Sequence, residues 1–286
     1  MANIEAVLPL ISRDLDRFDI FAKSIDKFYP ELSVCHVIVP DRQYHDCKKH
    51  ITHKRYKLIR ETDIVPELKP FKETSGWYKQ QIIKLAMHEF VNSDQYITFD
   101  ADVFCVKYVN TDELIVNGKA MSRRTTHDYH SSWYEWAERV LKMKRSGFTH
   151  GVTPAIFSVE CIRKLVNHLK QLMFSCGSLT QYTYHSLKKL HYIPFNWKSY
   201  LLMNTPWTEY SLYNTFIEYK KLFDNYHFDA GEHCIYHKSV WKNEQFDKWD
   251  PSQVFNNSDK YYFCVVQSTT DIDPKMIENK ISEYFA

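Results

Sequence analysis

The pattern in this sequence best suited to chemistry is a pair of aspartates, Asp100 and Asp102, one residue apart. The run Tyr96–Phe99 before them is β-branched and aromatic, which predicts a buried strand. The run Val103–Val106 after them is apolar again. Carboxylates at positions i and i+2 point the same way if the backbone stays extended. Two hard oxygen ligands then converge at the carboxyl end of a strand, which suits Mg²⁺ or Mn²⁺ and the phosphates that these ions bring with them.

A helix is expected just upstream of the acid pair, with Ser75 as its cap. Its apolar stripe would pack on the sheet and consists of Ile82, Leu85, Ala86 and Phe90. Another face of the same helix carries Trp77, Gln80 and Lys84, at spacing i, i+3 and i+7. Because this helix leads directly into the strand before Asp100, we expect that face to point toward the acid pair.

Strands and helices alternate through the first third of the chain. The runs Ile4–Leu10, Val34–Val39 and Tyr56–Ile59 predict strands, and a helix is expected between the first two, capped by Ser12 or Asp14 and ending at Phe28. This alternation is typical of a parallel α/β sheet. Such sheets bind ligands at the carboxyl ends of their strands, which is where the acid pair falls.

Several polar side chains follow strand ends and are candidates to contact a ligand. Arg13 and Asp41 lie just past the first two strands, where they would contact a base, ribose or phosphate, or else be ordinary surface residues. A short strand at 120–122 would deliver Arg123. The polar segment 125–132 after it resembles an active-site loop and contains His127, Asp128 and His130.

Further helices and strands are predicted in the second half of the chain, and no internal repeat is evident. Leu114 and Ile115 are expected in a turn. Helices are expected at 133–145, 160–174 and 274–285, and strands at 151–158 and 261–267. Thr208 is expected to cap a further helix, which places Glu209 in its first turn. There the helix dipole stabilises a carboxylate, so Glu209 is either a simple capping acid or an acid that faces a cleft.

Composition narrows the class of protein. With 37 basic and 35 acidic residues the net charge is +2, which predicts no nucleic-acid partner. The 20 Tyr, 18 Phe and 7 Trp exceed the needs of a core, so we expect some to line a groove. The seven cysteines are odd in number and widely spaced, as free thiols in a reducing compartment are. With no signal peptide or apolar run long enough for a membrane span, these features favour a cytoplasmic protein.

Four segments together resemble the GT-A class of nucleotide-sugar glycosyltransferases, in particular bacterial and viral enzymes of capsule or glycan synthesis. The resemblance extends over about positions 4 to 240 and rests on residues 37–41 (VIVPD), 76–81 (GWYKQQ), 99–102 (FDAD) and 207–210 (WTEY). It implies a Rossmann-like, mostly parallel mixed sheet flanked by helices, followed by a C-terminal helical region on the acceptor side. It further implies one catalytic domain, residues 1–286. Residues 1–120 would bind the nucleotide sugar, and residues 121–286 the acceptor.

The resemblance also implies roles for particular residues. Mn²⁺ or Mg²⁺ would be held by Asp100 and Asp102, with His233, or failing that His237, as a further ligand. The donor would contact Arg13, Asp41, Trp77, Gln80, Lys84, Asp100 and Arg123. If the reaction inverts the sugar's configuration, a carboxylate must deprotonate the acceptor hydroxyl, for which Glu209 is the first candidate and Asp128 the second. If the reaction retains configuration, Glu209 would hold the acceptor instead.

The expected reaction is transfer of a sugar from a nucleoside-diphosphate donor, with UDP favoured, to a glycan or other hydroxyl acceptor. Two alternatives stay open. A nucleotidyltransferase or phosphohydrolase would use the same acid pair, although residues 9–13 (PLISR) are not a glycine-rich phosphate loop. A carbohydrate-binding protein without catalytic activity would use the aromatic residues. Metal-dependent release of nucleoside diphosphate from a donor separates the transferase from the binding protein.

Overall fold

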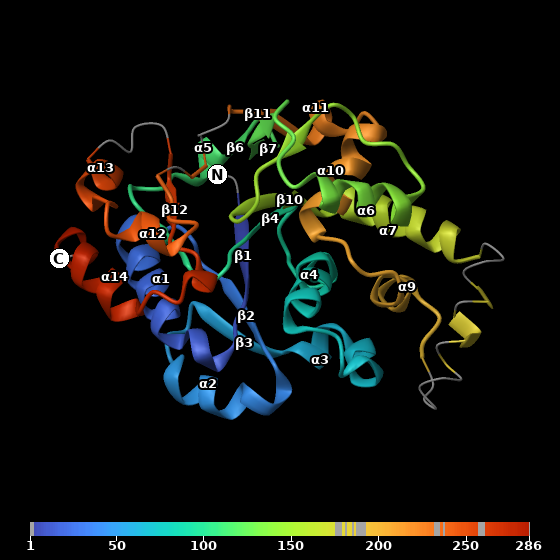
Figure 1. Cartoon of the computed structure of the whole chain (residues 1–286), viewed down its shortest axis with the longest axis horizontal. Helices are drawn as coiled ribbons and strands as arrows, with labels where there is room; N and C mark the ends of the chain where they lie inside the picture. Colours follow the sequence, from blue (N-terminus) through green and yellow to red (C-terminus); the bar gives the residue numbers. More distant parts are fainter. Residues whose placement is uncertain are drawn as a thin grey trace.

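The computed structural model describes residues 3–174, 179–180, 182–184, 186, 193–231, 235–236, 238–256 and 261–285. Its centre is a five-stranded sheet in the order β10-β4-β1-β2-β3 (Figure 1). The strands are β1 (Ile4–Pro9), β2 (Cys35–Val39), β3 (Tyr56–Arg60), β4 (Gln95–Thr98) and β10 (Ala155–Ser158). The first four are parallel to one another, and β10 pairs antiparallel with β4 at the edge. The expected mixed, mostly parallel α/β fold is confirmed.

The strand order places a ligand-binding position between β1 and β4. From β1 the chain moves outward in one direction to β2 and β3, and then returns to the other side of β1 as β4. At such a reversal the connections leave the sheet on opposite faces, and a crevice opens at the carboxyl ends of the two central strands. Pro9 ends β1 there, and the acid pair follows β4 at the same edge.

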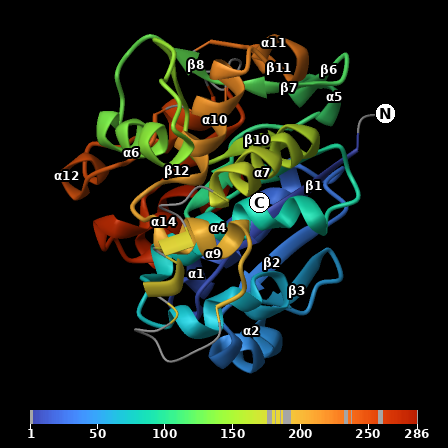
Figure 2. The same ribbon diagram turned by 90° about the vertical axis from the view of Figure 1, so that its right-hand side faces the viewer.

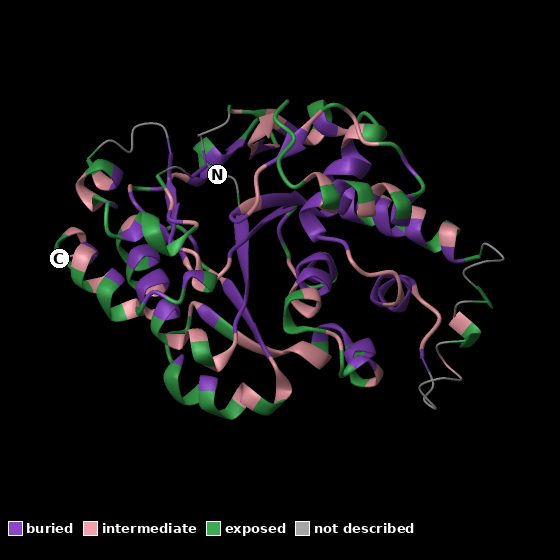
Figure 3. Cartoon of the chain, in the orientation of Figure 1, coloured by how far each residue is buried: buried purple, intermediate pink, exposed green. Residues whose placement is uncertain are grey.

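Alternate residues of each strand enter two separate cores. On one face, Val7, Ile38 and Tyr96 pack with the helices α4 (Gly76–Ala86), α7 (Val159–Met173), α9 (Trp197–Met203) and α10 (Glu209–Tyr219). On the other face, Leu8 and Val37 pack with α1 (Leu15–Phe28) and α2 (Tyr44–His50). Period-2 alternation with both faces buried is expected of a covered parallel sheet. Figure 2 views the molecule from the side of α4, α7 and α9, and Figure 3 shows the central strands buried.

Three smaller sheets surround the central one. They are formed by β6 (Ile115–Val116), β7 (Lys119–Ser122) and β11 (His227–Asp229); by β5 (Val103–Cys105) and β12 (Phe263–Val265); and by β8 (Arg124–Thr125) and β9 (Thr149–His150). Other α-helices among the described residues are α3 (Glu61–Ile64), α5 (Thr111–Leu114), α6 (Ser131–Leu141), α11 (Phe223–Tyr226), α12 (Asn243–Phe246), α13 (Pro251–Phe255) and α14 (Pro274–Ile281). Leu114 and Ile115 are therefore not in a turn, because they end α5 and begin β6.

The C-terminal elements return to the N-terminal half. β12 pairs antiparallel with β5, the strand that follows the acid pair. A third core joins Ile20 of α1 to Phe104, Val254 and Ile277, so that α13 and α14 pack beside α1 (Figure 1). The last stretch of the chain is thereby fixed against the edge of the sheet that carries Asp100 and Asp102.

Candidate active site

A cavity of about 590 Å³ opens at the carboxyl ends of β1 and β4. Its walls come from segments far apart in the sequence, from Pro9 and Asp14 to Gln267, Ser268 and Thr269. Trp77, Gln80 and Lys84, which the helical spacing places on one face of α4, all line it, as do Asp100 and Asp102. The expectation that this face of α4 points toward the acid pair is therefore correct.

The acid pair reaches the cavity through a turn and not through extended backbone. β4 ends at Thr98, and the amide of Val103 donates to the carbonyl oxygen of Asp100 over 3.2 Å. The amide of Asp100 itself donates to Oγ1 of Thr153, 3.1 Å away. The expected i, i+2 strand geometry was wrong in this detail, because the chain turns at Ala101 to begin β5. Both carboxylates nevertheless face the same space.

Asp102 is held from one side only. Its Oδ2 accepts a 2.7 Å hydrogen bond from the amide of Ser268, whereas its Oδ1 is buried with no hydrogen-bond partner. Burial and the nearby charge of Asp100 raise the pKa of Asp102 to about 6, although the Ser268 amide and Arg17 act in the opposite direction. A buried, unsatisfied carboxylate oxygen beside a second carboxylate is an electrostatically costly arrangement that a cation would relieve.

Arg17 fixes the segment that contains Ser268. From α1 the buried guanidinium donates to the carbonyl oxygens of Val266, at 2.9 Å, and Ile272, at 2.7 Å. These two carbonyls lie on either side of Ser268 in sequence. Burial lowers the pKa of Arg17, with Asp102 and Asp14 opposing that shift, but a guanidinium stays charged in proteins. Arg17 therefore positions the backbone amide that binds Asp102.

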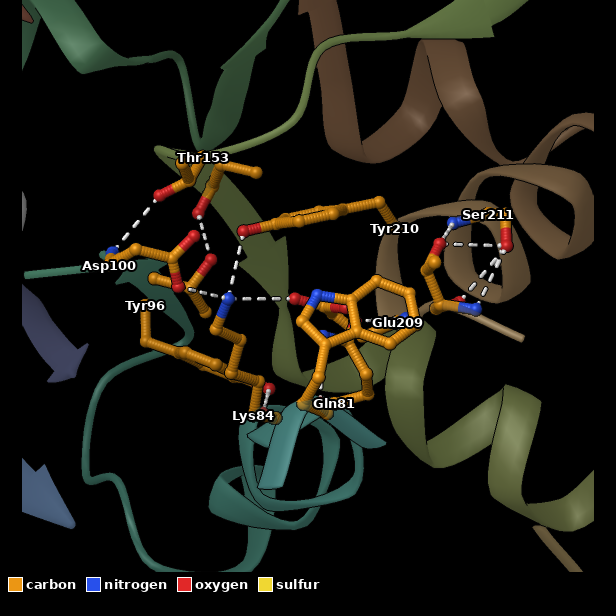
Figure 4. A network of polar contacts seen from close by, with 12 residues as sticks. Gln81, Lys84, Tyr96, Asp100, Thr153, Glu209, Tyr210 and Ser211 are labelled. Atoms are coloured by element: carbon orange, nitrogen blue, oxygen red, sulfur yellow. Dashed lines mark hydrogen bonds and ion pairs between the residues drawn. The ribbon is translucent and has the colours of Figure 1, made fainter. Parts of the chain in front are cut away.

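Lys84 joins α4, the acid pair and α10 in one buried network, drawn in Figure 4. Its Nζ lies 2.7 Å from Oδ1 of Asp100, 2.9 Å from Oε1 of Glu209 and 3.1 Å from the hydroxyl of Tyr210. Its side chain is 1% exposed and that of Glu209 is 0% exposed. Burial alone disfavours the ammonium, but the two carboxylates hold the pKa of Lys84 well above its usual value. Lys84 is therefore a permanent cation beside Asp100.

Glu209 is placed by the start of α10. Thr208 caps this helix, with its hydroxyl accepting from the amide of Ser211 over 3.0 Å. The amide of Glu209 donates to Oε1 of Gln81 over 3.3 Å, which ties α10 to α4. Burial raises the pKa of Glu209, and its ion pair with Lys84 opposes that rise. Glu209 is not among the residues that line the cavity, although its neighbours Thr208 and Tyr210 are.

Aromatic rings form another wall of the cavity. Trp77 of α4 and Trp133 of α6 have ring centroids 5.8 Å apart, and His130 stacks on Trp133 at 4.1 Å with planes 8° apart. Tyr129 lines the cavity beside them and is 43% exposed. Arg123 lies over the ring of Tyr236, with its Cζ 4.8 Å from the ring centroid. A wall of partly exposed aromatic faces is suited to a flat or apolar ligand surface.

The model of a family of unknown function, DUF6492, matches residues 1–286. The chain belongs to the DUF6492 family. Among curated proteins, no sequence matches this chain significantly. One of the solved structures to which this DUF6492 protein is similar is mouse xyloside xylosyltransferase 1 in its apo form, with 11% sequence identity and a TM-score of 0.49. The alignment covers 95% of this chain and 100% of that chain.

Of the other predicted site residues of this DUF6492 protein, Arg123 lines the cavity, whereas Arg13, Asp41 and Asp128 are not among its lining residues. Arg13 is exposed and lies 3.6 Å from Asp14. Asp41 accepts a hydrogen bond from the Thr62 hydroxyl, and Asp128 pairs with Arg145 at 2.8 Å. His233 and His237 lie outside the described residues. The described residues contain no group of three His, Cys, Asp or Glu side chains that could hold a metal ion, and no helix among them is long and apolar enough to cross a bilayer.

A second polar cluster beside the cavity had no clear signal in the sequence. His150 lines the cavity, and its Nε2 lies 3.0 Å from Oε1 of Glu218. Arg124 binds the same carboxylate at 2.8 Å, and the Ser122 hydroxyl lies 3.2 Å from Nδ1 of His150. The four residues come from β7, β8, β9 and α10, so only the tertiary fold brings them together.

Proposed function

We propose that this protein is a metal-dependent glycosyltransferase of GT-A type. It moves a sugar from a nucleoside-diphosphate donor, with UDP favoured, to a hydroxyl group of a glycan acceptor in polysaccharide synthesis. The observation that carries the proposal is the acid pair at the β1/β4 crevice, with Oδ1 of Asp102 buried and unpartnered at the edge of a 590 Å³ cavity. A phosphorylated ligand bridged by a cation is the chemistry that such an edge accommodates.

The charges around the pair support a cation there. Asp100, Asp102 and Glu209 contribute three carboxylates, and Lys84 alone among the lining residues pairs with two of them. Arg17 offsets part of the charge of Asp102, but its guanidinium also donates to two backbone carbonyls. Mg²⁺ in proteins is usually bound by one or two carboxylates together with substrate phosphates, so two protein ligands suffice. Asp100 and Asp102 would hold the ion, and His233 stays a candidate third ligand.

The bound ion would supply charge neutralisation for the departing diphosphate. The protein's own residues supply the rest. Lys84 holds Asp100 in place and adds a fixed positive charge close to the diphosphate position, and Arg123, which also lines the cavity, adds a second charge. Preorganised charges of this kind stabilise a transition state without reorganisation at the moment of reaction. Transfer breaks the anomeric carbon–oxygen bond to the diphosphate and forms one to the acceptor oxygen, whose proton must leave.

We propose for Glu209 a role different from the one that the sequence favoured. A general base must come within hydrogen-bond reach of the acceptor hydroxyl, directly or through one water molecule. The carboxylate of Glu209 is fully buried against Lys84, which supports a role as the counter-ion that keeps Lys84 in position. The inverting mechanism with Glu209 as base stays a prediction that a variant can test. The division into a donor half, 1–120, and an acceptor half, 121–286, also stays a prediction.

A thermal-shift screen tests the proposal directly. The wild-type protein is melted with UDP-, GDP- and dTDP-sugars, each with and without Mn²⁺. A donor at 100 times its Kd stabilises the folded state by about 2.7 kcal/mol, which corresponds to a rise in Tm of roughly 5–10 °C. We expect one class of donor to raise Tm in a Mn²⁺-dependent way, and Asp102→Asn to abolish the shift.

The exposed Asp247→Asn, far along the chain in a C-terminal turn, serves as the matched control and should shift like wild type. If Asp102→Asn keeps the full Mn²⁺-dependent shift, the acid pair is not the metal site. If no nucleotide sugar raises Tm, the transferase assignment fails.

A further inference from the structure

The aromatic residues on the wall of the cavity are packed against one another. Trp77, Trp133 and His130 form a continuous row of rings, with successive centroid distances of 5.8 and 4.1 Å, and Tyr129 adjoins them. We call these four residues the aromatic platform. His130 has φ of 58° and ψ of 43°, a left-handed conformation that costs a non-glycine residue about 1 kcal/mol or more. In this conformation its ring lies flat on Trp133, directly before the first turn of α6.

The platform is firmly anchored to the rest of the fold. The hydroxyl of Tyr134, which follows Trp133 in α6, accepts a hydrogen bond from the amide of His150 over 2.9 Å. Asp128 is bound by Arg145, and the Thr149 hydroxyl donates to the carbonyl oxygen of His127. The segment before α6 is therefore held at both of its ends. A rigid surface of exposed rings loses little conformational freedom when a ligand binds.

The chemistry of the platform is apolar, aromatic and uncharged. Burial and the charge of Arg123 lower the pKa of His130, so its ring is neutral at pH 7. Gln80, one turn after Trp77 on α4, lines the same cavity and offers an amide. A sugar ring presents an apolar face of C–H groups and an edge of hydroxyls. Aromatic faces beside an amide match both parts.

We propose that a neutral sugar ring of the acceptor glycan lies on the aromatic platform. That this sugar belongs to the acceptor rests on the proposed function. Binding of a sugar ring to the platform does not depend on the donor. It moves Trp77 and Gln80 from the donor, to which the sequence assigned them, to the acceptor.

The two faces of the sheet argue for this division. α4 packs on one face of the sheet and α1 on the other. Pro9, Asp14 and Ser268 line the cavity next to α1 and the end of β1, and two of the three are polar. In folds of this type the nucleotide binds at the end of the first strand. A donor with its diphosphate at Asp102 and its nucleoside beside β1 leaves the platform, on the α4 side, for the second substrate.

Saturation-transfer NMR with methyl glycosides of glucose, galactose, mannose and N-acetylglucosamine tests the proposal without any donor. We expect at least one of them to receive saturation at its ring C–H protons. Trp133→Ala and Trp77→Ala should each weaken its binding about tenfold or more. Trp136→Ala is the matched control, because Trp136 lies on the same helix, packs against Arg139 and does not line the cavity. This control should bind the sugar like wild type.

Binding of UDP with Mn²⁺, measured by calorimetry on the same variants, identifies the occupant. Loss of sugar binding with UDP binding retained supports the acceptor platform. Loss of UDP binding in Trp77→Ala and Trp133→Ala shows that a nucleobase occupies the rings and overturns the proposal, as does the absence of binding by all four glycosides. Tyr129→Ala, in the exposed loop, repeats the test if Trp133→Ala does not fold. If the protein binds a sugar but hydrolyses no donor, the proposed transferase function is wrong and the platform is still a sugar-binding site.

Discussion

The backbone amide of Ser268 donates a hydrogen bond to Oδ2 of Asp102 across 2.7 Å, although the two residues are 166 positions apart. The acid at the edge of the sheet is thus oriented by a segment from the last tenth of the chain. Arg17 completes the arrangement from α1 through the carbonyl oxygens of Val266 and Ile272. Three distant parts of the sequence therefore determine the position of one carboxylate.

Replacing Arg17 with Leu should loosen the segment that contains Ser268. Two buried carbonyl oxygens lose their charged donor, and hydrogen bonds of that kind contribute about 1.5–3 kcal/mol each. We expect the free energy of unfolding in urea to fall by about 3 kcal/mol. Donor binding should weaken as well, because Asp102 loses its fixed partner. Arg13→Leu is the control, since the Arg13 side chain is 76% exposed, and it should leave stability unchanged. Equal stability of the two variants would show that the hydrogen bonds from Arg17 to Val266 and Ile272 do not stabilise the fold.

Glu209→Gln separates a base from a counter-ion. Loss of a general base lowers the rate about 10²–10⁴-fold. Loss of a counter-ion leaves the reacting groups in place, so we expect kcat to stay within about tenfold of wild type. The measurement is release of nucleoside diphosphate under saturating donor and Mn²⁺. A rate loss of 10²-fold or more with unchanged donor affinity would restore Glu209 as the base.

Lys84→Met should be the most damaging single change in this network. It leaves Asp100 and Glu209 without the ammonium that lies within 3 Å of both. Breaking a buried ion pair from one side typically costs about 3–5 kcal/mol. In the double variant Lys84→Met/Glu209→Gln, part of the loss should be recovered, with a coupling energy of about 1–3 kcal/mol in urea unfolding. Strict additivity of the two changes would mean that the pair is not coupled.

The buried His227 predicts a loss of stability at low pH. Its Nε2 lies 2.6 Å from the Tyr213 hydroxyl, and burial together with the charge of His150 lowers its pKa to about 3. The unfolded chain takes up a proton on this residue near pH 6.5 and the folded chain does not. Its contribution to stability is therefore complete above pH 6.5 and is lost as pH falls toward 3, by about 1.4 kcal/mol per unit.

Urea midpoints between pH 7.5 and pH 5 measure this effect. His227→Phe should flatten the dependence of stability on pH, whatever its effect on stability at pH 7.5. His53→Phe, at an exposed position, should keep the wild-type slope. A slope that His227→Phe leaves unchanged would assign the acid sensitivity to other groups.

The sequence predicted most of the fold because the relevant patterns are local. The strands that end at Pro9, Val39 and Arg60 are mostly apolar. The helical spacing of Trp77, Gln80 and Lys84 predicted that they share one face, and all three line the cavity. The acid pair was found for the same reason. Polar residues directly after a buried strand stand out against their apolar surroundings.

The contacts between distant segments had no such signal. The burial of Glu209 depends on Lys84, which reaches it from a helix about 125 positions earlier, and a first-turn carboxylate looks the same whether it faces solvent or a lysine. Nothing near Ser268 marks its amide as a partner of Asp102. Arg13 and Asp41 follow strand ends as expected, but Arg13 is exposed beside Asp14, Asp41 is bound by Thr62, and neither lines the cavity.

The hydrogen bond from Ser268 also has a consequence for the order of events during biosynthesis. Both acids have been translated when little more than a third of the polypeptide exists, whereas the amide that orients one of them is among the last groups translated. A nascent chain released before position 266 would contain both Asp100 and Asp102, but the carboxylate of Asp102 would lack the hydrogen bond that orients it. We expect such a truncated product to be inactive toward donors.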